Sequence, residues 1–138
     1  MTEVIEKTEN KKGYKKTKLG WIPEDWDIKY LGDLCKKNIS NGIFNNPNKV
    51  GKGYKLINVI DLYSEPNIKT DDLNLLDATK AEVMNFSAQK GDIFFTRSSL
   101  KLEGIAHCNI FESAEENILF ECHIMKVHPK KNEIIPKY

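Results

Sequence analysis

Arginine is almost absent from this sequence of 138 residues, and lysine carries nearly all of its positive charge. Arg97 is the single arginine, against twenty lysines. The net charge of +1 predicts neither a nucleic acid nor an acidic partner. The charges are segregated, however, since lysines cluster in residues 7–18 and 29–55 and acidic residues in 61–82 and 112–121. A nearly neutral chain of this kind can still present one basic face.

Long apolar runs and paired cysteines are also lacking. No apolar run approaches the ~20 residues of a membrane span, and residues 1–18 are too polar for a signal peptide. The three cysteines, Cys35, Cys108 and Cys122, are odd in number and widely spaced. We therefore expect free thiols and a soluble protein in a reducing, cytoplasmic setting, without a membrane partner.

Catalytic motifs are missing as well. The sequence has no C-x-x-C or H-E-x-x-H pattern, no glycine-rich phosphate loop and no spaced carboxylate set for Mg²⁺. The pairs His107–Cys108 and Cys122–His123 fall in expected strands, where adjacent side chains point to opposite faces. We expect no catalytic residue, no metal and no cofactor, and hence a protein that is not an enzyme.

The pattern of apolar residues predicts one α+β domain. We expect a flexible charged tail over residues 1–18 and a single domain over residues 19–138. About six short strands and two or three short helices favour a curved, mostly antiparallel sheet. The segments expected are strands at 26–31, 54–59, 93–96, 105–111 and 121–127, a helix at 78–85 capped by Asp77, a long loop at 38–53 and irregular chain at 64–76.

Two polar loops could bind a nucleic acid. The first holds five asparagines and three glycines within residues 38–53, and the second follows the strand at 93–96. Arginine and asparagine suit the base edges of guanine and adenine, and lysine suits phosphates. The alternatives are a solvated turn for the first loop, and for Arg97 an ion pair with Asp92 or Glu103. The candidate DNA-binding residues are Asn45, Asn46, Lys49 and Lys52 in the first loop and Arg97, Ser98, Ser99 and Lys101 in the second.

Three stretches, taken together, resemble the specificity subunits of type I restriction–modification systems. Residues 19–26 (LGWIPEDW) with the Leu-Gly-Asp turn at 31–33 resemble the opening of that family. Residues 54–61 (YKLINVID) resemble the strand after its variable glycine loop. Residues 91–100 (GDIFFTRSSL) and 103–105 (EGI) resemble the strand and loop near the core of a target-recognition domain.

The resemblance implies DNA binding without catalysis. Members of the family carry two recognition domains, each of which reads one half of a split target, and these domains are joined by helices that dock separate methyltransferase subunits. The present sequence then corresponds to one target-recognition domain, apparently incomplete at its C-terminal end. The implied partners are double-stranded DNA, methyltransferase subunits and a second specificity half. The alternative is a protein-interaction fragment of a specificity subunit that does not bind DNA.

Overall fold

The structure, a computed structural model, describes residues 11–99 and 101–135. The chain forms two compact units, residues 1–30 and residues 31–138. Of the tail expected over residues 1–18, residues 1–10 lie outside the described part. Among the helices of the described residues, none has the length and apolar character needed to cross a membrane.

The first unit contains an antiparallel hairpin of strands β1 (Tyr14–Thr17) and β2 (Gly20–Pro23). The hydroxyl of Thr17 fixes the two-residue turn, because it donates to the carbonyl of Gly20 at 2.8 Å and accepts from the N–H of Leu19 at 3.1 Å. Gly20 has a φ of +107°, which favours glycine. The hairpin thus orders residues 14–17, for which we expected a flexible tail.

No strand forms over residues 26–30, where apolar and polar residues alternate, so this prediction was wrong. The alternating apolar side chains Trp26, Ile28 and Tyr30 are all exposed. Alternation produces a strand only where one face is buried and a partner strand supplies hydrogen bonds. The 3₁₀ helix η1 (Leu31–Leu34) follows this segment.

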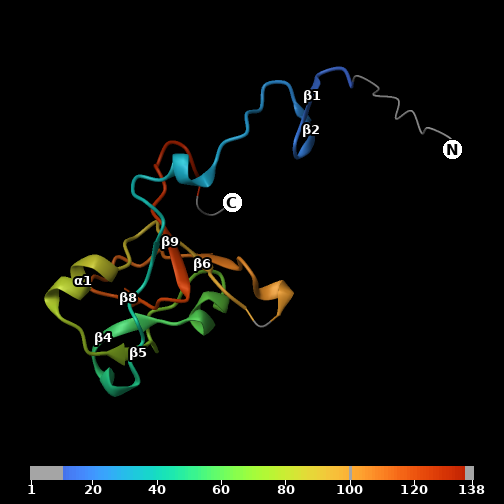
Figure 1. Cartoon of the computed structure of the whole chain (residues 1–138). Helices are drawn as coiled ribbons and strands as arrows, with labels where there is room; N and C mark the ends of the chain where they lie inside the picture. Colours follow the sequence, from blue (N-terminus) through green and yellow to red (C-terminus); the bar gives the residue numbers. More distant parts are fainter. Residues whose placement is uncertain (1–10, 100, 136–138) are drawn as a thin grey trace. The chain divides into compact units, whose positions relative to one another are not determined.

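The second unit has an α+β architecture, as expected, but its strands divide into two open sheets rather than one curved sheet (Figure 1). The first sheet is antiparallel, in the order β3 (Ser40–Asn41), β9 (Ile124–Val127), β6 (Ile93–Thr96), β7 (Cys108–Ile110). In the second sheet, β4 (Val50–Ile57) pairs antiparallel with β5 (Asn74–Leu76) and parallel with β8 (Leu119–Phe120).

One α-helix, α1 (Lys80–Phe86), is present among the described residues, and three further 3₁₀ helices accompany it. The residue that caps α1 is Thr79 rather than Asp77: its hydroxyl accepts from the N–H of Glu82 at 3.2 Å, while the Glu82 carboxylate accepts from the N–H of Thr79 at 2.8 Å. This reciprocal pair satisfies two N–H groups that the first turn of a helix leaves free. The 3₁₀ helices are η2 (Pro47–Lys49), η3 (Val59–Tyr63) and η4 (Leu102–Gly104).

Four expected segments differ from the structure. Residues 38–53 are not all loop, because they hold β3, η2 and the start of β4. Residues 64–76 are not all irregular, because β5 closes them. The strands expected at 105–111 and 121–127 are shorter, as β7 and β9, because a turn precedes each of them.

The core of the second unit lies around Phe94 of β6, whose side chain is fully buried. Its ring contacts those of Phe111 and Phe120, with centroids 6.4 Å and 5.1 Å away. A second cluster, which includes Leu56, Leu76 and Leu119, fills the space beneath α1. Aromatic rings of this size dominate core energetics, so β6 is firmly held where the polar segment that follows it begins.

Candidate nucleic-acid interface

Four polar segments leave the same end of the two sheets. Strands β4 and β8 are parallel and end together, since Ile57 pairs with Phe120. Strand β9 begins where β6 ends, since Thr96 pairs with Ile124. We call this end the loop rim, and define it as residues 43–45, 58–61, 97–99 with 101–104, and 121–123.

Hydrogen bonds join these segments to one another. The N–H of Ile43 donates to the carbonyl of Phe120 at 2.8 Å, and the N–H of Glu121 donates to the carbonyl of Ile57 at 3.1 Å. Glycine at position 42 permits this approach, because a Cβ atom there would overlap the carbonyl oxygens of Phe120 and Glu121. The rim is therefore one connected surface built from segments far apart in the sequence.

Arg97 lies at the centre of the rim, directly after β6. Its N–H donates to the carbonyl of His123 at 2.8 Å, and its Nη1 lies 3.4 Å from the carbonyl oxygen of Cys122. The side chain is exposed, so most of its five donors stay available to a ligand. The alternative pairing with Asp92 is not seen, since that buried carboxylate accepts from the N–H of Gln89 and from His128 Nδ1.

The rest of the second candidate loop is exposed and locally folded. Ser98, Ser99 and Lys101 are exposed beside Arg97. Ser99 Oγ accepts from the N–H of Lys101 at 3.1 Å, and the hydroxyl of Thr96 donates to the carbonyl of Gly104 at 2.5 Å. These bonds fold the segment back onto the end of β6. The side chains of Arg97 and Lys101 therefore extend from backbone that is held in place.

The amides of Asn45 and Asn46 are engaged within the protein. Asn45 Nδ2 donates to Asn58 Oδ1 at 3.1 Å, while its Oδ1 is buried without a hydrogen-bond partner among the described residues. Asn46 Oδ1 accepts from the N–H of Asn48 at 3.0 Å and begins η2. In this conformation both amides hold their own loop, and the Oδ1 atom of Asn45 is buried.

Lys49 and Lys52 lie away from the rim, at the opposite end of β4. The carbonyl of Lys49 accepts from the N–H of Asp77 at 2.9 Å, and Lys52 Nζ lies 3.6 Å from the Asp77 carboxylate. The side chain of Lys52 is 77% exposed, and exposed pairs of this kind are weak. Of the eight candidate residues, Asn45, Arg97, Ser98, Ser99 and Lys101 lie on the rim, Lys49 and Lys52 form a lysine group beside the start of α1, and Asn46 lies between them at the start of η2.

Helix η3 supports the rim from one side. The carboxylate of Asp61 accepts from the N–H of Asn58 at 2.7 Å, which holds the first turn of η3. Burial raises the pKa of Asp61, although this hydrogen bond partly opposes the shift. Asn58, which also holds Asn45, is a positioning residue that the sequence analysis did not single out.

The turn between β8 and β9 is a further feature that the sequence analysis missed. Glu121, Cys122 and His123 form a bridge and turn rather than part of a strand, so the argument that adjacent side chains point apart does not apply to them. The available signal was a polar triplet between two apolar runs, 118–120 and 124–125, which is typical of a tight turn. Glu121 is buried, whereas His123 is exposed.

Comparisons with known proteins identify relatives of this chain. No protein-family model matches it. The "Putative type I restriction enzyme MjaX specificity subunit" of Methanocaldococcus jannaschii is 32% identical over 126 residues, which cover 91% of this chain and 29% of that protein. The "Type I restriction enzyme EcoKI specificity subunit" of Escherichia coli is 23% identical over 101 residues, which cover 72% of this chain and 21% of that protein.

Both relatives are described as specificity subunits of type I restriction enzymes. The similarity extends over the β-hairpin unit and the α+β unit, since the first alignment covers 91% of the chain. The sequence resemblance seen in residues 19–105 is thereby confirmed. The chain spans less than a third of the length of either relative. Over most of its own length, this chain is a relative of the specificity subunits of type I restriction enzymes.

Proposed function

We propose that this chain binds duplex DNA in a sequence-specific manner, as the target-recognition part of a type I specificity subunit. The observation that carries the proposal is the exposed Arg97, which stands on a loop rim in a relative of specificity subunits. The α+β unit would be a target-recognition domain, and methylation and cleavage would be carried out by separate subunits that it directs.

In the proposed mechanism Arg97 and its neighbours on the rim read bases. A guanidinium donates two parallel hydrogen bonds to the O6 and N7 atoms of guanine, and each such pair is worth about 1–3 kcal/mol of discrimination. Arg97 is suited to this role because its backbone N–H bonds to the carbonyl of His123 and its Nη1 contacts the carbonyl of Cys122, which together orient the side chain. Ser98, Ser99 and Lys101 would contact neighbouring phosphates or base edges.

The lysine group would add affinity without selectivity. Lys49 and Lys52 would contact phosphates beyond the bases read at the rim, and each phosphate contact contributes a slope of about −0.9 to the dependence of log affinity on log salt. Asn45 and Asn46 would then support the loop between the rim and the lysine group, or turn outward only when DNA is bound.

The test is a selection from a pool of random duplexes, bound by the full chain at moderate salt and sequenced. We expect enrichment of a short motif that contains guanine. Lys49→Ala and Lys52→Ala should weaken binding to all sequences equally and flatten the salt slope by about one unit each. A bound pool identical in sequence to the starting pool would rule out sequence-specific recognition.

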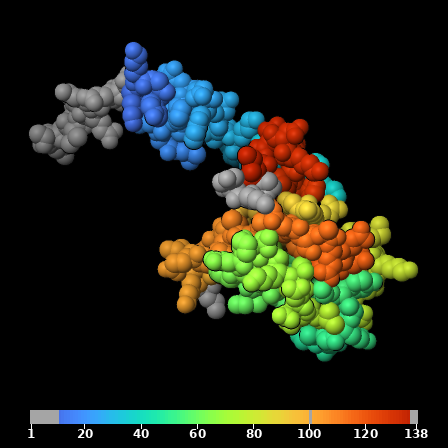
Figure 2. Space-filling model, turned by 180° about the vertical axis from the view of Figure 1, so that it is seen from behind, coloured from blue at the N-terminus to red at the C-terminus, as the bar shows by residue number. Residues whose placement is uncertain are grey.

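A second candidate function, docking to another protein, is favoured by one observation. Helices η3 and η4 are neighbours, since a Cβ atom added at Gly104 of η4 would lie 3.3 Å from the hydroxyl of Tyr63 in η3. Figure 2 shows the segments around them, in green and orange, on one face of the molecule. Both segments contain exposed apolar side chains. Clustered exposed apolar residues often mark a protein contact. The residues concerned are Ile60, Tyr63, Leu102 and Ile105, with Leu102 81% exposed.

Capture experiments separate the two functions. We would mix the tagged chain with methyltransferase subunits of a type I system, in the presence and absence of duplex DNA. Capture that Leu102→Asp abolishes, combined with no gel shift at physiological salt, would favour the protein-interaction fragment. Capture together with a sequence-dependent gel shift supports the recognition function, including its proposed partner subunits.

A further inference from the structure

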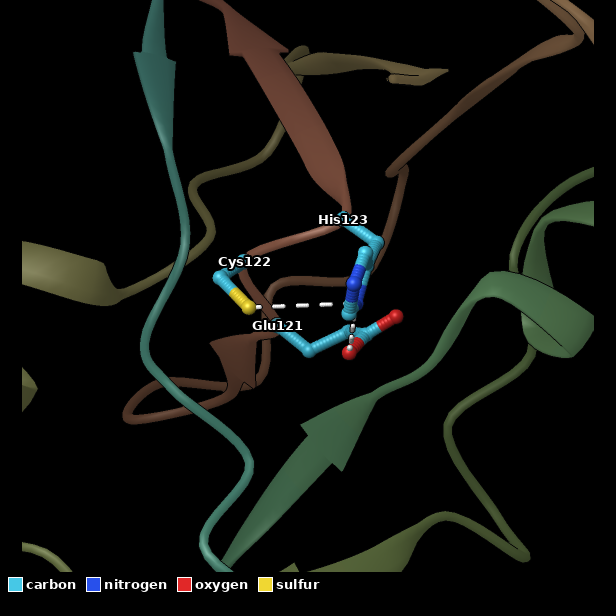
Figure 3. Close-up of side chains that lie close together, drawn as sticks. All are labelled: Glu121, Cys122 and His123. Carbon is cyan, nitrogen blue, oxygen red and sulfur yellow. Dashed lines mark hydrogen bonds and ion pairs between the residues drawn. The ribbon is translucent and has the colours of Figure 1, made fainter. Parts of the chain in front are cut away.

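The turn between β8 and β9 brings three different metal-binding groups together. The carboxylate of Glu121, the thiol of Cys122 and the imidazole of His123 have ligand atoms that all lie within 4.8 Å of one another. Figure 3 shows the three side chains gathered on one side of the turn. His123 Nδ1 lies 3.1 Å from Glu121 Oε2 and 3.8 Å from Cys122 Sγ.

The backbone explains why consecutive residues can converge. Glu121 is held by its bridge to Ile43, and the chain then reverses before β9 begins at Ile124. In a strand, neighbouring side chains would alternate between the two faces, but a turn removes this alternation. The N–H of Arg97 donates to the carbonyl of His123 and the N–H of Glu121 to that of Ile57, so backbone hydrogen bonds hold the turn on both sides.

The distances are those that a tetrahedral ion requires. Zn²⁺ binds oxygen, nitrogen and sulfur at about 2.0–2.3 Å, so neighbouring ligand atoms around it lie about 3.3–3.8 Å apart. The two printed separations at His123, 3.1 Å and 3.8 Å, fall close to this range. The third edge, between the Cys122 thiol and the Glu121 carboxylate, is no longer than 4.8 Å.

The chemistry of the donors indicates which ion would bind. A thiolate together with an imidazole selects zinc-like ions over Mg²⁺ and Ca²⁺, which prefer oxygen ligands alone. The Glu121 side chain is 9% exposed and faces His123, whereas the His123 side chain is 59% exposed. The buried carboxylate would form the floor of the site, and the exposed imidazole would leave it open to an ion from solution.

We propose that Glu121, Cys122 and His123 form a three-ligand site for Zn²⁺, with water in the fourth position. The site goes beyond the proposed function, because it does not depend on DNA binding. It also differs from the expectation that the chain holds no metal, which depended on a strand at these residues. A bound ion would tie three consecutive residues of the rim together directly beneath the Arg97 side chain.

The experiment is a titration of the full chain with Co²⁺, followed by displacement with Zn²⁺. We expect one equivalent of Co²⁺ to give the thiolate-to-cobalt absorption and the visible bands of a tetrahedral complex, and Zn²⁺ to abolish both. Cys122→Ser should remove the thiolate band and weaken Zn²⁺ binding by about tenfold or more, since even the loss of an outer partner costs 10–100-fold. His123→Ala should weaken binding to a similar extent.

Cys108→Ser is the matched control, because Cys108 is an exposed free thiol on β7 outside the turn. It should bind Co²⁺ and Zn²⁺ like the unaltered chain. Glu121 is buried, so the circular dichroism of Glu121→Gln must first match that of the unaltered chain. The proposal is overturned if no thiolate band appears, or if Cys122→Ser and Cys108→Ser bind Zn²⁺ equally well; the Glu121–His123 contact would then be an ordinary ion pair.

Discussion

Arg97 contacts the backbone carbonyl of Cys122, 3.4 Å from its Nη1, and no ion pair joins it to a carboxylate among the residues that the structure describes. A carbonyl orients a guanidinium without neutralising its charge. The contact is also long for a hydrogen bond, so it contributes little to stability. Arg97 is therefore an exposed cation on a backbone that is held in place. This arrangement is expected of a residue that binds a ligand rather than of one that stabilises the fold.

The first prediction separates binding from stability. Arg97→Ala should lower the discrimination between the selected duplex and a random duplex by about 1–3 kcal/mol. Its free energy of unfolding in urea should change by less than about 0.5 kcal/mol, because the side chain is exposed. Arg97→Lys should keep the affinity for random DNA but not the discrimination, since an ammonium cannot form the paired hydrogen bonds. Unchanged discrimination in both variants would exclude Arg97 as the base-reading residue.

The second prediction concerns the packing of the rim. Gly42→Ala should lower the free energy of unfolding by about 1–3 kcal/mol, since its Cβ would overlap the carbonyls of Phe120 and Glu121 and would force the backbone apart. Gly32→Ala is the matched control, because nothing lies within 4 Å of the added Cβ there. Urea denaturation measures both. Equal stability of the two variants would mean that residue 42 is not packed against β8 in solution.

The third prediction concerns the core. Phe94→Ala should lower the free energy of unfolding by about 3–5 kcal/mol, because it leaves a cavity between Phe111 and Phe120. Ile60→Ala, at a residue that is 74% exposed, should change it by less than about 0.5 kcal/mol. Thermal and urea unfolding would report the difference, and comparable losses in the two variants would contradict the central position of β6.

The fourth prediction concerns acid stability. The hydrogen bond from Lys55, 2.6 Å long, lowers the pKa of Glu115 below its ordinary value of 4.5, with a smaller contribution from Thr70. A carboxyl whose folded pKa is lowered stabilises the fold above its ordinary pKa, and this contribution is lost as the pH falls through the folded pKa. Lys55→Met should therefore raise the pKa of Glu115 toward 4.5 and reduce the loss of stability on acidification.

Carboxyl NMR titration of Glu115 measures this change directly. Lys80→Met, at an exposed lysine that begins α1, is the control and should leave the Glu115 titration unaltered. A Glu115 pKa that is the same with and without Lys55 would show that the ion pair does not persist in solution.

Strand β6 could be predicted from the sequence because its signal is local. Residues 93–96 are a short run of β-favouring apolar residues, and the structure places them between two antiparallel neighbours. The position of Arg97 directly after a buried strand followed from this run alone. Strand β4 was harder to place, since its first residues are glycines and lysines, and its pairing with Leu76 depends on a segment some twenty residues further along.

The errors at residues 26–30 and 121–123 have one physical origin. In both segments, a strand was predicted from the pattern of apolar residues along the chain, without knowledge of which strand would pair with it. Trp26, Ile28 and Tyr30 alternate correctly but have no strand to pair with among the described residues. Residues 121–123 were joined to the apolar run that follows them, although they form the turn between β8 and β9. The burial of Asn45 and the convergence at the β8–β9 turn depend on such long-range pairing.

Strand β6 is flanked on both edges, by β9 on one side and β7 on the other. Its amide protons should therefore exchange with solvent more slowly than those of the polar segment beginning at Arg97, which is held only by local hydrogen bonds and by contacts with the β8–β9 turn. A ligand that binds Arg97 would need to immobilise only the exposed side chains of that segment. The entropy lost on association would accordingly be small, and variation in the outer residues could change which ligand is chosen while the scaffold stays the same.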